Sequence, residues 1–119
     1  MRTAYAQTAV VALAPGADLA GPGAAVTLDL CGSWDHEPPC PLAPHHTAVE
    51  DVDGLAHLRI LFAAEPADEA EVRDRIGRAL AGGAVDGPDG RTSRWTLVST
   101  ASDDVTADEE EHAARLTQS

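Results

Sequence analysis

The chain has 119 residues, enough for one domain, and a net charge of −12 from 20 acidic and 8 basic residues. An acidic field of this kind repels phosphate backbones and anionic lipid surfaces, so the composition argues against nucleic acid and membranes as partners. A basic protein is the macromolecular partner that such a charge would attract.

The amino-acid usage gives few further clues to location. No apolar stretch reaches the roughly 18–20 residues of a membrane span, and the apolar run at residues 9–14 is too short for a secretory signal. The absence of Lys and Asn indicates a genome with GC-rich codons, as in high-GC bacteria. We therefore expect a single cytoplasmic domain over residues 1–119.

The first third of the chain predicts two strands. Residues 4–14 form an apolar segment that ends at the turn signal Pro15-Gly16, and residues 15–23 are rich in Gly and Pro. Residues 25–31 alternate, with Val26, Leu28 and Leu30 on one face. This pattern predicts a second strand that ends at Cys31, with the cysteine on the side away from the apolar residues.

A hairpin is predicted next. Residues 47–52 and 55–62 flank Asp53-Gly54, a preferred pair for a two-residue type I′ turn. Counting back from that turn, Glu50 should lie opposite His57.

The last part of the chain predicts two helices separated by a strand. Residues 66–81 begin with Pro66, carry acidic residues first and arginines later, and stop at Gly82-Gly83. Residues 94–100 predict a strand, and Thr106 with Glu109 forms a capping box before a short acidic helix that ends near Leu116. We therefore expect an α+β, two-layer sandwich: a mainly antiparallel sheet with one long and one short helix on one face and a Pro-rich Cys/His loop.

That loop is the stretch richest in potential chemistry. Its ligand-type residues follow the spacing C-x4-H-x3-C-x4-H-H and are Cys31, His36, Cys40, His45 and His46. Four of the eight prolines of the chain lie between Cys31 and His46, which excludes a helix or a central strand there. Thiolate sulfur and imidazole nitrogen are the donors of tetrahedral Zn²⁺, so the sequence predicts a metal site made by Cys31, His36, Cys40 and one of the two adjacent histidines.

Other metals, and explanations without any metal, also account for these residues. Zn²⁺ suits the donor set best, with Cu⁺ or another transition metal as the next choices. A Cys31–Cys40 disulfide, a redox-active thiol pair, or two buried thiols beside solvent-exposed histidines would explain the same residues without metal.

Three functional hypotheses follow. The first is a small metal-binding protein in which Zn²⁺ has a structural or metal-handling role. The second is an acidic interaction module that docks a basic partner, or imitates the charge of nucleic acid, without metal. The third is a zinc enzyme with an open coordination position, for which Asp35 or Glu37 beside His36 is the candidate general base. The sequence leaves the oligomeric state open.

Overall fold

The computed structural model describes residues 2–31, 43–87 and 89–118. Five antiparallel strands form one curled sheet in the order β2-β3-β1-β5-β4. The strands are β1 (Thr3–Leu13), β2 (His45–Val52), β3 (Leu55–Ala64), β4 (Ala84–Asp86) and β5 (Thr92–Asp103). The α-helices are α1 (Gly21–Cys31), α2 (Glu69–Ala81) and α3 (Glu110–Thr117), and short 3₁₀ turns, Pro66–Asp68 and Ala107–Glu109, precede α2 and α3.

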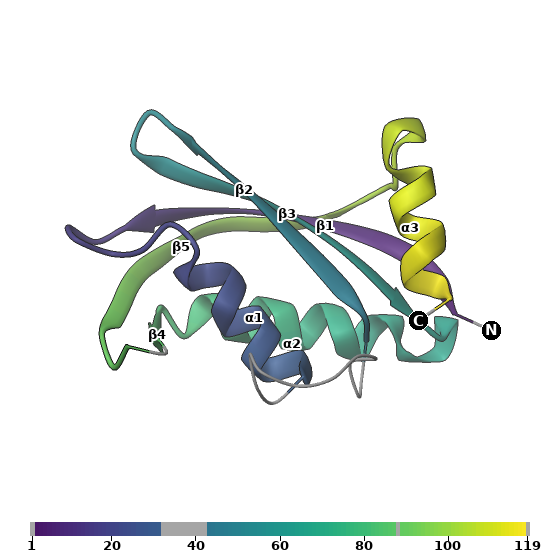
Figure 1. The fold of residues 1–119 in the computed structure, drawn as a ribbon, viewed down its shortest axis with the longest axis horizontal. Coiled ribbons are helices and arrows are strands. Elements are labelled where there is room, and N and C mark those ends of the chain that lie inside the picture. Colours follow the sequence, from purple (N-terminus) through teal and green to yellow (C-terminus); the bar gives the residue numbers. More distant parts are fainter. Residues whose placement is uncertain (1, 32–42, 88, 119) are drawn as a thin grey trace.

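The helices lie on both faces of the sheet. In Figure 1, α1 and α2 lie side by side below the strands, whereas α3 stands on the opposite side at one end. The expected α+β class and mainly antiparallel sheet are confirmed, but the expectation that all helices share one face is wrong. Without β4 and α3, the order β-α-β-β-α-β with β1 and β3 in the centre is the ferredoxin-like arrangement.

The hydrophobic core lies between the sheet and the first two helices. From β3 it takes Leu58, Ile60 and Phe62, and from α2 it takes Val72, Ile76 and Leu80. The side chains of Val72, Ile76 and Leu80 recur at helical spacing, so one stripe of α2 faces the strands. The indole N–H of Trp95 donates to the carbonyl of Leu80 at 2.8 Å, which joins β5 to the end of α2.

The segment predicted as a second strand is helical. In α1, Val26 and Leu30 are buried one turn apart, whereas Leu28 is only partly buried. The i, i+2, i+4 pattern contains an i, i+4 pair and therefore fits a helix as well as a strand. The Gly-Pro-Gly sequence that suggested a loop forms the start of the helix, where the missing N–H of Pro22 costs no intrahelical bond.

The first strand and the hairpin are confirmed. The register pairs Val52 with Leu55 and Glu50 with His57, as the turn predicts. Asp53 and Gly54 both have positive φ, 53° and 82°, as a type I′ turn requires at its two central residues.

The C-terminal third agrees with the sequence except for one added strand. The long helix, the following strand and the Thr106–Glu109 capping box are confirmed, and β5 is longer than predicted. The added element is β4, which pairs with the start of β5. At Gly83, φ is 72° and an added Cβ would lie 2.7 Å from the carbonyl oxygen of Trp95, so glycine is needed for this turn.

An irregularity in β5 determines which way its side chains point. Val10 pairs with Ser99 and Val11 pairs with Leu97, so Val98 is the extra residue of a β-bulge. Within the described ranges, no helix is long and apolar enough to span a membrane.

Candidate functional site

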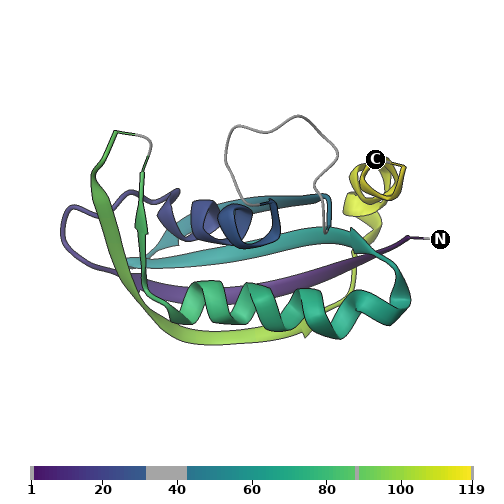
Figure 2. The same ribbon diagram turned by 90° about the horizontal axis from the view of Figure 1, so that it is seen from below.

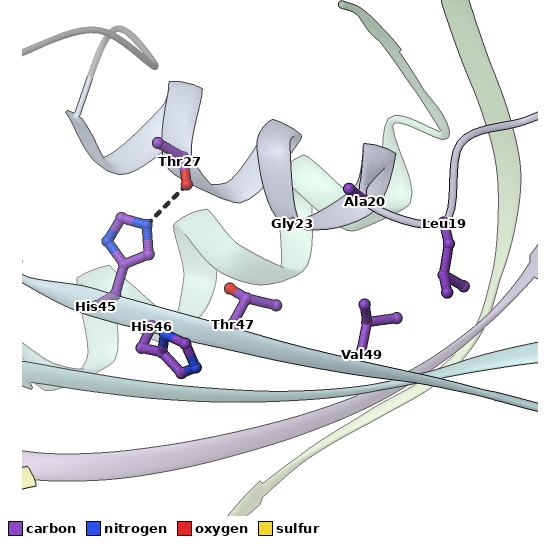
Figure 3. Close-up of a pocket in the computed structure, with 8 residues that line it drawn as sticks. All are labelled: Leu19, Ala20, Gly23, Thr27, His45, His46, Thr47 and Val49. Carbon is purple, nitrogen blue, oxygen red and sulfur yellow. Dashed lines mark hydrogen bonds between the residues drawn. The ribbon is translucent and has the colours of Figure 1, made fainter. Parts of the chain in front are cut away.

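A pocket of about 320 Å³ opens between α1 and the edge strand β2. Figure 3 shows its lining, with His45, Thr47 and Val49 of β2 directed toward the helix. The lining residues are Leu19, Ala20, Gly23, Thr27, His45, His46, Thr47 and Val49. The pocket therefore combines aliphatic groups with hydroxyl and imidazole groups, a composition that suits a small ligand or an ion.

His45 is held by hydrogen bonds at both ring nitrogens. Its Nδ1 lies 3.1 Å from the carbonyl oxygen of Ala43, and its Nε2 lies 3.0 Å from Oγ1 of Thr27. A carbonyl can only accept, so Nδ1 carries the proton. It follows that Nε2 presents its lone pair and accepts a hydrogen bond from the Thr27 hydroxyl. This tautomer makes Nε2 the nitrogen that can bind a metal or take a proton.

Thr47 places a second hydroxyl beside the same pocket. Its Oγ1 is buried and makes no hydrogen bond with any residue that the structure describes. The side chain is pressed close to α1: a Cβ added at Gly23 would lie 3.3 Å from the Cγ2 of Thr47. Gly23 therefore lets the helix approach the strand, and a ligand in the pocket could pair with the hydroxyl that is left without a partner.

The two adjacent histidines lie on opposite faces of β2, as the alternation of a strand requires. His45 pairs across the hairpin with Phe62, on the side of α1 and α2, whereas His46 pairs with Leu61 on the other side. There the ring of His46 contacts the ring of His112 from α3, with 4.6 Å between centroids. Burial, and to a smaller extent the neighbouring His112, lower the pKa of His46 below its usual value. The two side chains therefore point away from each other, as the sequence suggested for adjacent histidines.

Of the remaining predicted ligands, the structure describes only the position of Cys31. Cys31 is the last residue of α1, one turn after Thr27, and not the end of a strand as we expected. His36 and Cys40 lie outside the described residues, as do Asp35 and Glu37. Among the residues that are described, no group of three or more His, Cys, Asp or Glu side chains forms a metal-binding cluster.

A second polar site lies on the opposite face of the sheet. The guanidinium of Arg59 bonds to Glu109 at 2.6 and 2.8 Å, to Asp103 at 2.7 Å and to the carbonyl of Asp104 at 2.8 Å. These bonds lower the pKa of Glu109 to about 2 and lower that of Asp103. All three nitrogens of the Arg59 guanidinium donate to residues 103–109, which precede α3, so this cluster attaches that helix to β3.

Arg73 is also satisfied within the protein. It bonds to Glu69 and to the carbonyl of Ala6, and its guanidinium lies over the rings of Tyr5 and Phe62 at 5.6 and 5.2 Å. Arg73, Arg75 and Arg78 each form an ion pair with an acidic residue four positions earlier in α2. These arginines therefore stabilise the helix. We therefore do not regard this row as an anion site.

Sequence reasoning missed Thr27, Thr47 and His112. Thr27 lies four residues before Cys31, a spacing that places the two on one side in a helix and in the expected strand alike. The contact of Thr27 with His45 forms only when α1 packs on β2, so the spacing alone did not indicate it. The contact between His46 and His112 joins positions far apart in the chain, and no local pattern indicates it.

Comparison with known proteins adds no relative: no protein-family model, no curated protein and no solved structure matches this chain.

Proposed function

We propose that this chain is a small metal-binding protein whose site lies where α1 ends and β2 begins, with His45 Nε2 as one ligand. The observation that supports this best is the hydrogen bond from His45 Nδ1–H to the carbonyl of Ala43. Metal-binding histidines commonly donate their second ring N–H to a carbonyl or carboxylate, which fixes the tautomer and orients the lone pair.

The thiolates are the proposed partners of this imidazole. Cys31 is one turn beyond Thr27, the residue that contacts His45, so the backbone brings the cysteine position and the histidine to the same end of α1. Cys40 and His36, named from the sequence, would complete four donors for Zn²⁺, with Cu⁺ as the alternative that thiolates also favour. His46 remains with His112 on the other side of β2 and is not a ligand in this proposal.

Metal binding would replace the hydrogen bond between Thr27 and His45. The hydroxyl of Thr27 occupies the lone pair that an ion needs, so it competes weakly with the metal and holds the ring in place until the ion binds. Whether the ion has a structural, handling or catalytic role depends on how many protein donors it has, because catalytic zinc keeps an open position.

The first experiment is elemental analysis of untagged protein purified without chelator, beside its non-reducing intact mass. We expect about one equivalent of zinc per chain and two free thiols. A metal-free protein lighter by about two protons would instead establish the Cys31–Cys40 disulfide. A metal-free protein with free thiols would overturn the proposal.

Variants then locate the site. We expect His45→Ala to weaken Zn²⁺ binding by at least about tenfold, as loss of a ligand does. The matched control is His57→Ala, an exposed histidine on the opposite face of the sheet. Thr27→Val, which removes the competing hydroxyl, should leave the affinity equal or higher. With Co²⁺ in place of Zn²⁺, loss of the thiolate charge-transfer band in Cys31→Ser or Cys40→Ser would identify the sulfur ligands.

A further inference from the structure

The face of the sheet opposite α1 and α2 is covered only at one end. There α3 buries Ala6, Leu61 and Ala63 against the strands. The rest, which we call the open face, consists by strand register of Thr8, Val10, Ala12, Ala48, Glu50, Val52, Leu55, His57, Arg59, Thr96, Ser99 and Ala101. Val98, the bulge residue, has no partner in this register, and we group it with its neighbour Ser99 because 57% of its surface is exposed. All of these are partly or fully exposed.

The open face is unlike the rest of the surface in charge. The chain has 20 acidic residues, but within the open face Glu50 is the acidic residue and Arg59 the permanent cation, with Asp103 opposite Ala6 at the α3 end and Arg94 two residues before Thr96 at the other end. Arg59 is itself bonded to Asp103 and Glu109 at the α3 end. The remaining residues, apart from His57, have aliphatic or hydroxyl side chains. In a chain of net charge −12, this is the surface on which another acidic molecule is repelled least.

The open face also carries a groove and a projection. The groove, of about 480 Å³, runs across β1, β2 and β3 beside Val10, Ala48 and Arg59. The projection is Val98 on β5, the extra residue of the bulge, with 57% of its surface exposed. It is the most exposed large hydrophobic side chain among the described residues. A groove and a projection on different strands of one face suit a two-fold contact, in which each copy supplies both.

We propose that the open face binds a second copy of this chain, with sheet against sheet. Charge decides between this partner and others. Nucleic acid requires a basic surface, and a basic protein would be drawn to the acidic surfaces elsewhere on the molecule, whereas a second copy brings a face as nearly neutral as this one.

The size of the contact sets the strength that we expect. From strand spacing and rise, the exposed parts of four strands cover roughly 19 by 23 Å, or about 450 Å² per copy. Standard interfaces bury about 800 Å² per partner, so the contact lies near the lower limit even with the side of α3 added. The dimer should therefore be in reversible equilibrium with the monomer. Salt should strengthen it, because salt screens the repulsion between two acidic chains.

Sedimentation velocity tests the proposal on the full chain, from about 1 to about 200 µM, a range that brackets the affinity of a small interface. Val98→Lys alters the projection, and Ala48→Lys alters the groove. The control is Ala70→Lys, which adds the same charge on the exposed side of α2. We expect the first two to weaken dimerisation at least about tenfold and the control to leave it unchanged, since a buried lysine in a small contact costs more than 1.4 kcal/mol. Far-ultraviolet circular dichroism and melting temperature verify that all three variants fold.

Two outcomes would overturn the proposal. One is a wild-type chain that stays monomeric at the highest concentration at both low and high salt. The other is a dimer that Ala70→Lys weakens as much as the two open-face variants do. Elemental analysis of the same samples keeps this test separate from metal binding, because the open face shares no residue with the proposed metal site.

Discussion

The two faces of the sheet are held by different forces. Under α1 and α2, the strands contribute Leu58, Ile60 and Phe62 to a continuous apolar core. On the opposite face, α3 has a single buried residue, Ala113; it covers Ala6, Leu61 and Ala63 and is otherwise attached by the ion cluster at Arg59 and by the contact between His46 and His112. Stability should therefore depend on volume and packing on one face, and on pH and charge on the other.

The largest expected effect is on the helix-covered face. Ile76→Ala removes a fully buried side chain of α2 and leaves a cavity that the sheet can only partly fill, which should lower the free energy of unfolding by about 3 kcal/mol. Urea unfolding measures this. The paired variant on the other face, Val98→Ala, should change the free energy by less than about 0.5 kcal/mol, because the side chain is exposed in the monomer. If Ile76→Ala and Val98→Ala lowered the free energy of unfolding by similar amounts, the contrast between the two faces would be wrong.

An intermediate effect is expected at the Arg59 cluster. The pKa of Glu109 is about 2 in the folded chain, below its ordinary value of 4.5, because it accepts hydrogen bonds from Arg59. Its contribution is therefore complete above pH 4.5 and is lost as the pH falls from 4.5 toward 2. We expect about 1–2 kcal/mol, after allowance for partial exposure. Glu109→Gln should flatten the dependence of unfolding free energy on pH in this window. An unchanged slope would show that the cluster contributes nothing.

The smallest effect concerns the ring contact between His46 and His112. Because His112 contributes to the lowered pKa of His46, His112→Ala should raise that pKa. The rise should be incomplete, since burial by the remaining structure is the larger cause, although loss of the ring also exposes His46 somewhat. An NMR titration of the metal-free protein follows the imidazole signal directly. A pKa that falls in the variant would contradict the contact between the two rings.

The elements that sequence reasoning placed correctly are those with strong local signals. The hairpin is specified by Asp53-Gly54, and α2 by its charge order and apolar stripe. The helix α1 was missed because Val26, Leu28 and Leu30 satisfy both periods, and the buried side of the segment is set by packing on α2, which is distant in sequence. The placement of α3 on the opposite face depends on Arg59 and His46, whose partners lie about 50 residues or more along the chain.

The candidate site was predictable in composition and not in arrangement. Adjacent histidines in a strand must diverge, and the structure places His45 and His46 on opposite faces of β2, as the sequence indicated. It could not indicate which of the two faces α1, because that depends on how the helix packs. Thr27 and the carbonyl of Ala43 orient His45, and His112 meets His46, through contacts that form only after the elements pack.

The bulge at Val98 also bears on how the chain tolerates changes of length. Val98 stands between Leu97, paired with Val11, and Ser99, paired with Val10. In a regular strand, deletion of one residue turns every following side chain to the wrong face. Here, deletion of Val98 would join Leu97 directly to Ser99 opposite two consecutive partners and restore plain alternation. Position 98 is therefore a place in β5 where the protein can lose a residue and keep Trp95 in the core.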